Sequence, residues 1–279
     1  MIRATVGAKN VKRGLRVHII TDLEGAAMVF RFDQTRVSEP TPAKLEAMRL
    51  LTAEVTACVD GILDFDPRAD VVVWDGHGSG GILYEQFHDR ARLLPHRNTP
   101  APYGLDATFD ALFFVGQHAM AGTPGAPLAH TYSSRTVEYY KLNGQPIGEF
   151  GMRAYMAGTL FGVPAAFLSG DDKAVAEAQA LVPRLVGVAT KQGTGLEAAL
   201  SLGPGEARRL IRRGARRACK RVAAGTVAPV RLDAPYTWEV RVLEGQEAAL
   251  DGYLRRPGAE RVDERTAVIR TDDPRAVLR

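Results

Sequence analysis

Short apolar runs that lead into polar, potentially ligating side chains form the main pattern along this chain. The runs 16–21, 71–75 and 111–116 have the length and the Val, Ile and Phe content of buried β-strands. Around or just after their ends lie Asp22 and Glu24, then Asp75 and His77, then His118. Because ligands of open α/β sheets bind at the carboxyl ends of the strands, we expect these side chains to gather at one sheet edge.

A helical pattern separates the first two runs. Residues 42–63 repeat apolar positions at helical spacing, and Thr41 before Pro42 is typical of a helix start. Strand, helix and strand in this order predict a βαβ unit, and therefore parallel pairing of the two strands.

The middle of the chain is predicted to alternate between turns, strands and helices. Residues 119–130 are dense in small and turn-forming residues and end in His130, so we expect a loop there. A hairpin on the Asn143-Gly144 turn is predicted over 137–149, with Glu149 where the hairpin passes into a helical pattern. The elements predicted next are a helix over 150–161, a strand over 164–168, a helix over 173–181 and a strand over 184–190.

Two adjacent acids, Asp171 and Asp172, open one of these helices. They are conceivable metal ligands, but an acid in the first turn of a helix is the usual capping and dipole arrangement. We therefore interpret them as capping residues.

The chain becomes strongly basic after residue 204. Basic residues recur in pairs every four residues, and small or apolar residues fill the gaps, which predicts a helix with one apolar stripe and a broad basic face. The pairs are Arg208 and Arg209, Arg212 and Arg213, Arg216 and Arg217, and Lys220 and Arg221. Such a face is usually solvated; nucleic acid or an acidic surface is the alternative partner. Residues 228–270 then alternate as strands do, including the segment 230–232.

These elements predict an α/β fold. We expect a three-layer core with a mixed or mostly parallel sheet and a smaller α+β C-terminal part. The expected divisions are an N-terminal extension over 1–15, a metal-binding catalytic domain over 16–203 and the C-terminal part over 204–279.

Composition narrows the class of protein only a little. The 279 residues are 46% hydrophobic and 24% charged, which is ordinary for a globular chain, and the net charge of +4 is too small to name a partner. The two cysteines, Cys58 and Cys219, lie in helical patterns, which favours neither a disulfide nor a thiolate zinc site. With no apolar leader and no membrane-length apolar run, we expect a cytoplasmic protein without a membrane partner.

The chemistry of the candidate residues favours zinc or a neighbouring metal. Carboxylates mixed with imidazoles suit such metals better than magnesium or calcium, which prefer all-oxygen ligands. Asp22 and Glu24 are two residues apart and would share a strand face, where they could hold one or two cations. A single histidine of this kind is more often an ordinary core or loop residue, so the argument depends on the whole set.

Six blocks in order resemble the zinc-dependent D-aminopeptidase family of the DppA type, over about residues 16–195. The blocks are Asp22-Leu-Glu24-Gly25, Asp75-Gly-His77, Gly116-Gln-His118-Ala, Thr123-Pro-Gly followed by His130, Asn143-Gly-Gln-Pro-Ile-Gly-Glu149, and Gly170-Asp-Asp-Lys.

The resemblance implies a site with two zinc ions. Asp22 would bridge the ions and Glu24 would bind one of them, and the residues completing the other would be His77, His118 and Glu149. His130 matches the family's catalytic histidine. The resemblance also implies short D-amino-acid peptides such as D-Ala-D-Ala as substrates, and a homo-oligomer of stacked pentameric rings, which is a decamer.

The chain departs from the family pattern near the expected pocket. Trp74-Asp75-Gly76 replaces a more usual Asn-Asp-Ser, and His130 is flanked by Ala129 and Thr131 rather than by two serines. The N-terminal extension is additional, and beyond residue 205 the resemblance is weak. These differences bear on the substrate more than on the metal.

We therefore expect a metallo-aminopeptidase that uses a zinc-activated water, with His130 moving a proton or stabilising the oxyanion. Asp75 is expected to orient one of the metal ligands rather than to bind the metal itself. The alternatives are a related metal-dependent amidase, an L-selective peptidase, and a nucleic-acid-binding protein that uses the basic helix over 208–221 and has a structural metal site.

Overall fold

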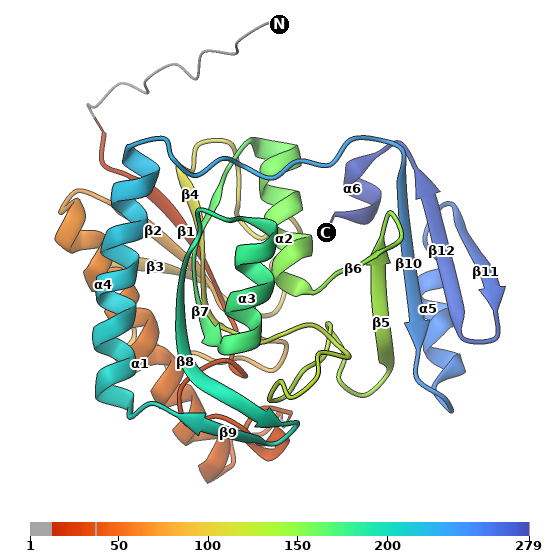
Figure 1. Cartoon of the computed structure of the whole chain (residues 1–279), viewed down its shortest axis with the longest axis horizontal. Coiled ribbons are helices and arrows are strands. Elements are labelled where there is room, and N and C mark those ends of the chain that lie inside the picture. Colours follow the sequence, from red (N-terminus) through yellow and green to blue (C-terminus); the bar gives the residue numbers. More distant parts are fainter. Residues whose placement is uncertain (1–12, 37, 279) are drawn as a thin grey trace, which may run out of the picture.

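The computed structural model describes residues 13–36 and 38–278 as two sheets with helices around them (Figure 1). Most of the predicted extension, residues 1–12, lies outside the described residues. Sheet A has seven strands in the order β3-β2-β1-β4-β7-β8-β9. Its strands are β1 (Arg16–Thr21), β2 (Asp70–Trp74), β3 (Ala91–Leu94), β4 (Ala111–Gln117), β7 (Ala165–Asp171), β8 (Val186–Gly195) and β9 (Ala198–Ser201). All neighbours pair in parallel except β8 and β9.

Helices cover both faces of sheet A, which gives the three layers that the sequence predicts (Figure 1). On one face α1 (Pro42–Phe65) and α4 (Pro204–Ala223) pack side by side, and on the other lie α2 (Glu149–Met156) and α3 (Asp172–Leu181). Every residue of β4 and β7 is buried. Central strands covered on both faces must be apolar on both sides, which explains their continuous apolar sequence.

Sheet B is antiparallel and has five strands in the order β11-β12-β10-β5-β6. Its strands are β5 (Val137–Leu142), β6 (Gln145–Pro146), β10 (Tyr236–Val242), β11 (Ala259–Asp263) and β12 (Thr266–Thr271). The short helices near it are α5 (Leu250–Leu254), α6 (Pro274–Val277) and the 3-10 turn η4 (Glu247–Ala249); two further 3-10 turns are η1 (Phe32–Gln34) and η2 (Tyr84–Gln86).

Sheet B joins segments that are distant in sequence. Strand β5 pairs with β10, so the predicted hairpin over 137–149 becomes part of the C-terminal sheet. Helix α4 packs on α1 beside sheet A. Strand pairing and helix packing thus join segments before residue 203 to segments after it. The predicted domain boundary at that residue stays a prediction.

Two local expectations differ from the structure. The helix predicted to end at residue 161 ends at Met156 and continues as a π-helical turn, η3 (Ala157–Phe161). Residues 230–232 are not a strand. They cross this turn instead, because Gly158 lets the Val230 carbonyl approach closely and the Leu232 amide donates to Thr159 Oγ1 at 3.1 Å.

Helix α4 has the predicted apolar stripe and basic face. Its buried positions include Ala215, Ala218 and Cys219, and Cys219 and Cys58 are buried free thiols. Part of the basic face is neutralised, because Arg212 forms ion pairs with acids of α1 and Arg209 with Glu206. Every helix in the described ranges is too short or too polar to cross a membrane.

Candidate metal centre

The ends of β1 and β4 are locked together where the candidate ligands begin. The Asp22 amide donates to the Val115 carbonyl at 2.9 Å, and the Gly25 amide donates to the Gly116 carbonyl at 2.7 Å. Both positions require glycine. A Cβ at Gly25 would lie 2.0 Å from the Gln117 carbonyl oxygen, and Gly116 has a φ of +80°, which other residues rarely adopt. This close crossing carries Asp22 and Glu24 to the ends of the neighbouring strands.

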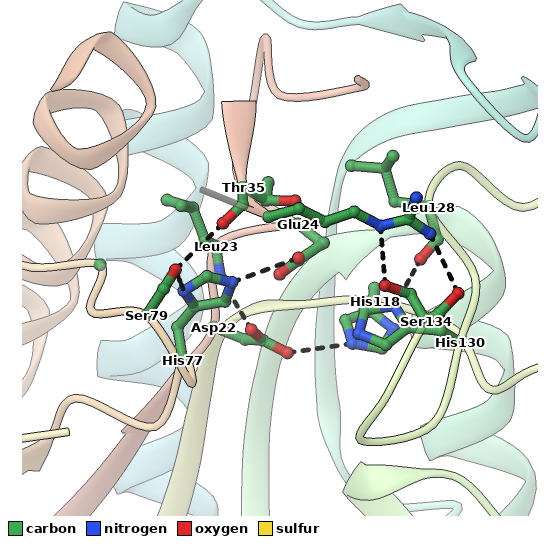
Figure 2. Close-up of polar contacts among 12 residues, drawn as sticks. Asp22, Leu23, Glu24, Thr35, His77, Ser79, His118, Leu128, His130 and Ser134 are labelled. Carbon is green, nitrogen blue, oxygen red and sulfur yellow. Dashed lines mark hydrogen bonds and ion pairs between the residues drawn. The ribbon is translucent and has the colours of Figure 1, made fainter. Parts of the chain in front are cut away.

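Figure 2 shows four of the predicted ligands, Asp22, Glu24, His77 and His118, close together, and the fifth, Glu149, contacts His118. His118 Nε2 is 3.1 Å from Asp22 Oδ2 and 3.4 Å from Glu149 Oε1. His77 Nε2 is 3.3 Å from Glu24 Oε1. Asp22 lies between the two histidines, so the side chains form two adjoining sets that share it.

The closest contacts pair these residues in another way than the zinc grouping that the family resemblance implies, and that grouping stays a prediction. That grouping places His77 with His118 and Glu149, whereas here His77 contacts Glu24 and His118 contacts Glu149. His77 reaches Glu24 because β2 and the turn after it lie on the side of β1 opposite to β4. The role of each residue as a ligand stays a prediction.

His130 lies against this group. Its ring stacks on the His118 ring with centroids 4.0 Å apart and an angle of 13° between the planes. Ligand atoms of His118, His130 and Glu149 all lie within 4.8 Å of one another. Distance alone therefore does not distinguish a catalytic His130 from a ligand.

Backbone contacts select the tautomers of two of these histidines. His130 Nδ1 is 2.8 Å from the Leu128 carbonyl, and His118 Nδ1 is 2.9 Å from the Ala119 carbonyl. A carbonyl only accepts, so each Nδ1 carries hydrogen and each Nε2 of the neutral ring presents a lone pair. Burial and the charge of His118 lower the pKa of His130, which favours its neutral form.

The carboxylates perturb one another strongly. Burial and the neighbouring Glu24 raise the pKa of Asp22 to about 7. Burial also acts to raise the pKa of Glu149, but the hydrogen bond and charge of His118 outweigh it and lower the pKa to about 2. The same acids raise the pKa of His118 well above its ordinary value against the effect of burial.

The donor set fits bound cations. Three carboxylates face two imidazoles, so the group carries excess negative charge unless cations are present. Among the described residues, Glu24 Oε2 is buried without a hydrogen-bond partner, and the buried His118 Nε2 faces the carboxylates of Asp22 and Glu149. Mixed nitrogen and oxygen donors of this kind suit zinc.

A second layer of polar residues holds the ligands. Lys44 is buried, and its Nζ donates to Ser79 Oγ at 2.6 Å and to the Thr35 carbonyl at 3.1 Å, beside His77 Nδ1. Nζ of the buried Lys191 donates to carbonyls of the loop after β1, including those of Glu24 and Ala26. Nothing in the sequence pattern distinguished Lys44. Lys191 directly follows the strand predicted over 184–190, and the structure extends that strand through it as β8.

Asp75 and Asp171 act on backbone amides. Asp75 was expected to orient a ligand, but it accepts from the amides of Gly81 and Ile82 and so orders the turn that carries His77. Asp171 is the predicted helix cap, since it accepts from the amides of Lys173 and Ala174. It also accepts from Ala119, the residue after His118.

A cavity of about 320 Å³ opens beside the group and is lined in part by His77, His130 and Glu149. Its wall also contains Trp74, Tyr132 and Arg153, whose roles the sequence analysis did not predict. Arg153 is four residues after Glu149 on α2, so helical spacing could have placed both on one face.

Comparisons with known proteins agree with this architecture. The family model described as D-aminopeptidase, Peptidase M55, matches residues 15–279. A D-aminopeptidase of Bacillus subtilis (strain 168) is 30% identical over 200 residues, which cover 71% of each chain. A solved structure, described as the Zn-dependent D-aminopeptidase DppA from Bacillus subtilis, a self-compartmentalizing protease, superposes with a TM-score of 0.85 at 25% identity and covers 95% of this chain and 94% of that one.

Proposed function

Because the chain belongs to the D-aminopeptidase family and is a peptidase, we propose that it removes N-terminal D-residues from short peptides in a zinc-dependent reaction. The observation that carries the proposal is the convergence of Asp22, Glu24, His77, His118 and Glu149 at the carboxyl edge of sheet A. The similar solved structure is that of a Zn-dependent enzyme, which supports the choice of metal.

We assign these five residues as ligands of two zinc ions. His77 with Glu24 and His118 with Glu149 are the two contacting pairs, and Asp22 lies between them. That arrangement supports two ions, with Asp22 shared. Bound zinc would supply Lewis-acid activation of a water molecule and of the scissile carbonyl.

The remaining chemistry falls to His130. Its Nδ1 is committed to the Leu128 carbonyl, so its Nε2 is the atom that accepts or returns a proton. Burial keeps the ring neutral at physiological pH, which is the form that a general base requires. Stacking on His118 fixes the ring beside the ligands.

Assembly and location extend the proposal. The similar solved structure is that of a self-compartmentalizing protease, which supports a homo-oligomer here, and the family resemblance implies a decamer of stacked rings. The cytoplasmic location stays a prediction from the sequence.

Hydrolysis of matched D-Ala and L-Ala para-nitroanilides and dipeptides by the zinc-loaded protein tests the proposal. We expect turnover of the D series, and loss of turnover when the metal is removed by chelation and restored by zinc. His130→Ala is expected to lower kcat by about 100-fold or more while the zinc content stays the same.

His88→Ala serves as the matched control, because His88 pairs with Asp60 away from the cavity. It is expected to keep kcat within about twofold of the parent. Turnover of the L series alone would make the protein an L-selective peptidase. Cleavage of simple amides without cleavage of dipeptides would make it an amidase.

A further inference from the structure

Arg153 is a buried cation in the wall of the cavity. Its side chain comes from α2, one turn after Glu149, and the residue is 8% exposed. It lines the same cavity as His130 and Glu149. An arginine keeps its charge at any physiological pH, so this charge is present beside the reaction site.

Aromatic rings surround this guanidinium. Its central carbon lies 4.2 Å from the ring centroid of Tyr103, 5.3 Å from that of Trp74 and 5.4 Å from that of Tyr132. Ring faces attract a cation, so the three rings stabilise the buried charge. They do not neutralise it.

No carboxylate in the part of the chain that the structure describes forms an ion pair with Arg153, and its Nη1 is buried without a hydrogen-bond partner. A buried charge is costly unless an opposite charge and hydrogen bonds accompany it. Glu149, one turn earlier on α2, acts on Arg153 through its charge but forms no ion pair with it, so Nη1 is available to an anion in the cavity. A guanidinium matches a carboxylate with two parallel hydrogen bonds.

Arg36, the second arginine of the same cavity, shows the contrast. It donates from Nε to Ser134 Oγ at 2.8 Å and from Nη2 to the Ser134 carbonyl at 3.1 Å, and it lies over the Phe32 ring. Two of its nitrogens donate within the protein, whereas Nη1 of Arg153 is buried without a hydrogen-bond partner.

We propose that Arg153 binds a carboxylate of the substrate and makes the enzyme selective for acidic substrates. The inference rests on the proposed peptidase function and adds the substrate class to it. The carboxylate is either the C-terminus of a dipeptide or an acidic side chain next to the scissile bond. A cavity of about 320 Å³ suits a ligand of this size.

Two matched substrate pairs test the proposal on the zinc-loaded protein. The first pair is D-Ala-D-Ala and its C-terminal amide. The second is D-Ala-D-Asp-amide and D-Ala-D-Asn-amide. We expect kcat/KM to favour the carboxylate member of one pair by about tenfold or more, chiefly through KM. The pair that shows the preference identifies the source of the carboxylate.

Substitutions then assign the preference to a residue. In Arg153→Met the ratio within the preferred pair is expected to fall to near one, and in Arg153→Lys to an intermediate value, because lysine keeps the charge but loses the two-pronged geometry. Arg36→Met is the matched control and is expected to keep the parental ratio. Calorimetric titration of the zinc-loaded His130→Ala protein with both members of the pair gives the same comparison without turnover.

The outcomes separate the two proposals. No hydrolysis of any D-peptide would contradict the proposed function itself. Hydrolysis of both members of each pair with a ratio near one would overturn the role of Arg153 and leave the peptidase intact. A ratio that survives in Arg153→Met, or that is lost in Arg36→Met instead, would also overturn it. If Arg153→Met does not fold, the role of Arg153 is tested by the substrate ratio in Arg153→Lys and by calorimetry on the His130→Ala protein, which retains Arg153.

Discussion

Lys191 shows how one buried side chain can shape a site that it does not enter. Its ammonium group donates to the carbonyls of Glu24, Ala26 and Val29, which belong to the buried irregular loop after β1. Glu24 belongs to this loop. The lysine therefore fixes the backbone from which a proposed ligand projects.

Replacing Lys191 with methionine is expected to destabilise the fold. The stem is nearly preserved, but several buried carbonyls lose their donor, and each unsatisfied acceptor costs about 1–3 kcal/mol. We expect the free energy of unfolding, measured in urea, to fall by at least about 2 kcal/mol. Lys220→Met on the exposed face of α4 is the control and is expected to stay within about 0.5 kcal/mol. Equal values for both variants would contradict this role.

His18 is a buried histidine that is distant from the proposed metal ligands. It lies in β1, its Nε2 is 2.9 Å from the Tyr103 carbonyl, and its Nδ1 has no partner among the described residues. Burial lowers its pKa to about 4 from 6.5. The folded protein therefore holds the ring neutral over a pH range in which the unfolded chain protonates it.

This difference predicts acid sensitivity. The folded pKa is below the unfolded one, so the stability that His18 contributes is complete above pH 6.5 and is lost as the pH falls from 6.5 towards 4. The free energy of unfolding of the parent minus that of His18→Gln is expected to decrease by up to about 3 kcal/mol over this range. Both proteins are unfolded in urea in the presence of a chelator. The difference between their free energies of unfolding cancels the contributions that other titrating groups make to the pH dependence. A difference that does not change with pH would contradict the assignment.

At the scale of elements, helices α1 and α4 approach each other closely at Gly61. A Cβ there would lie 2.2 Å from the Arg212 carbonyl oxygen and 3.0 Å from Ala215 Cβ. The added Cβ would clash with a backbone carbonyl of α4, so a change of side-chain rotamer cannot relieve the clash. The absence of a side chain at Gly61 sets the separation of the two helices.

We therefore expect Gly61→Ala to destabilise the protein despite the better helix propensity of alanine. Overpacking of this kind costs about 1–3 kcal/mol, and the propensity gain is at most about 1 kcal/mol. Gly205→Ala in α4 is the matched control, because no atom lies within 4 Å of the added Cβ. Its melting temperature is expected to stay equal or rise slightly. A Gly61→Ala protein as stable as Gly205→Ala would contradict the packing argument.

The sequence predicted most elements because their patterns are local. Helix α1 with its Thr41 cap, the Asn143-Gly144 turn and the Asp171 cap follow from neighbouring residues and are confirmed. Strand β3 was not predicted because it is short and only partly buried. The π-helical end of α2 depends on the crossing chain near Val230, which no local pattern contains.

The candidate site was predictable for a related reason. Asp22, Glu24, His77 and His118 follow the ends of parallel strands, which come together whatever their separation in sequence, whereas Glu149 opens α2. The supporting residues reach the site from α1 (Lys44), α2 (Arg153) and β8 (Lys191), and their contacts depend on packing that no local sequence pattern contains.

At the scale of the whole molecule, the proposed assembly is open to direct measurement. Sedimentation of the zinc-loaded protein is expected to give a multiple of the 30.2 kDa chain mass, with ten chains the value implied by the family resemblance. The same measurement in chelator separates metal binding from assembly. A single 30.2 kDa species at micromolar concentration would contradict the oligomer.

The pairing of β5 with β10 has a consequence for how the protein is made. All five proposed ligands precede residue 150, yet β5, which leads through β6 to Glu149, pairs with β10, a strand that follows α4. A nascent chain on the ribosome thus carries every metal-binding side chain long before the partner strand has emerged from the exit tunnel. We therefore expect the metal site to reach its final geometry late in biosynthesis. A chain truncated after α4 is expected to contain all the proposed ligands but not the complete metal site.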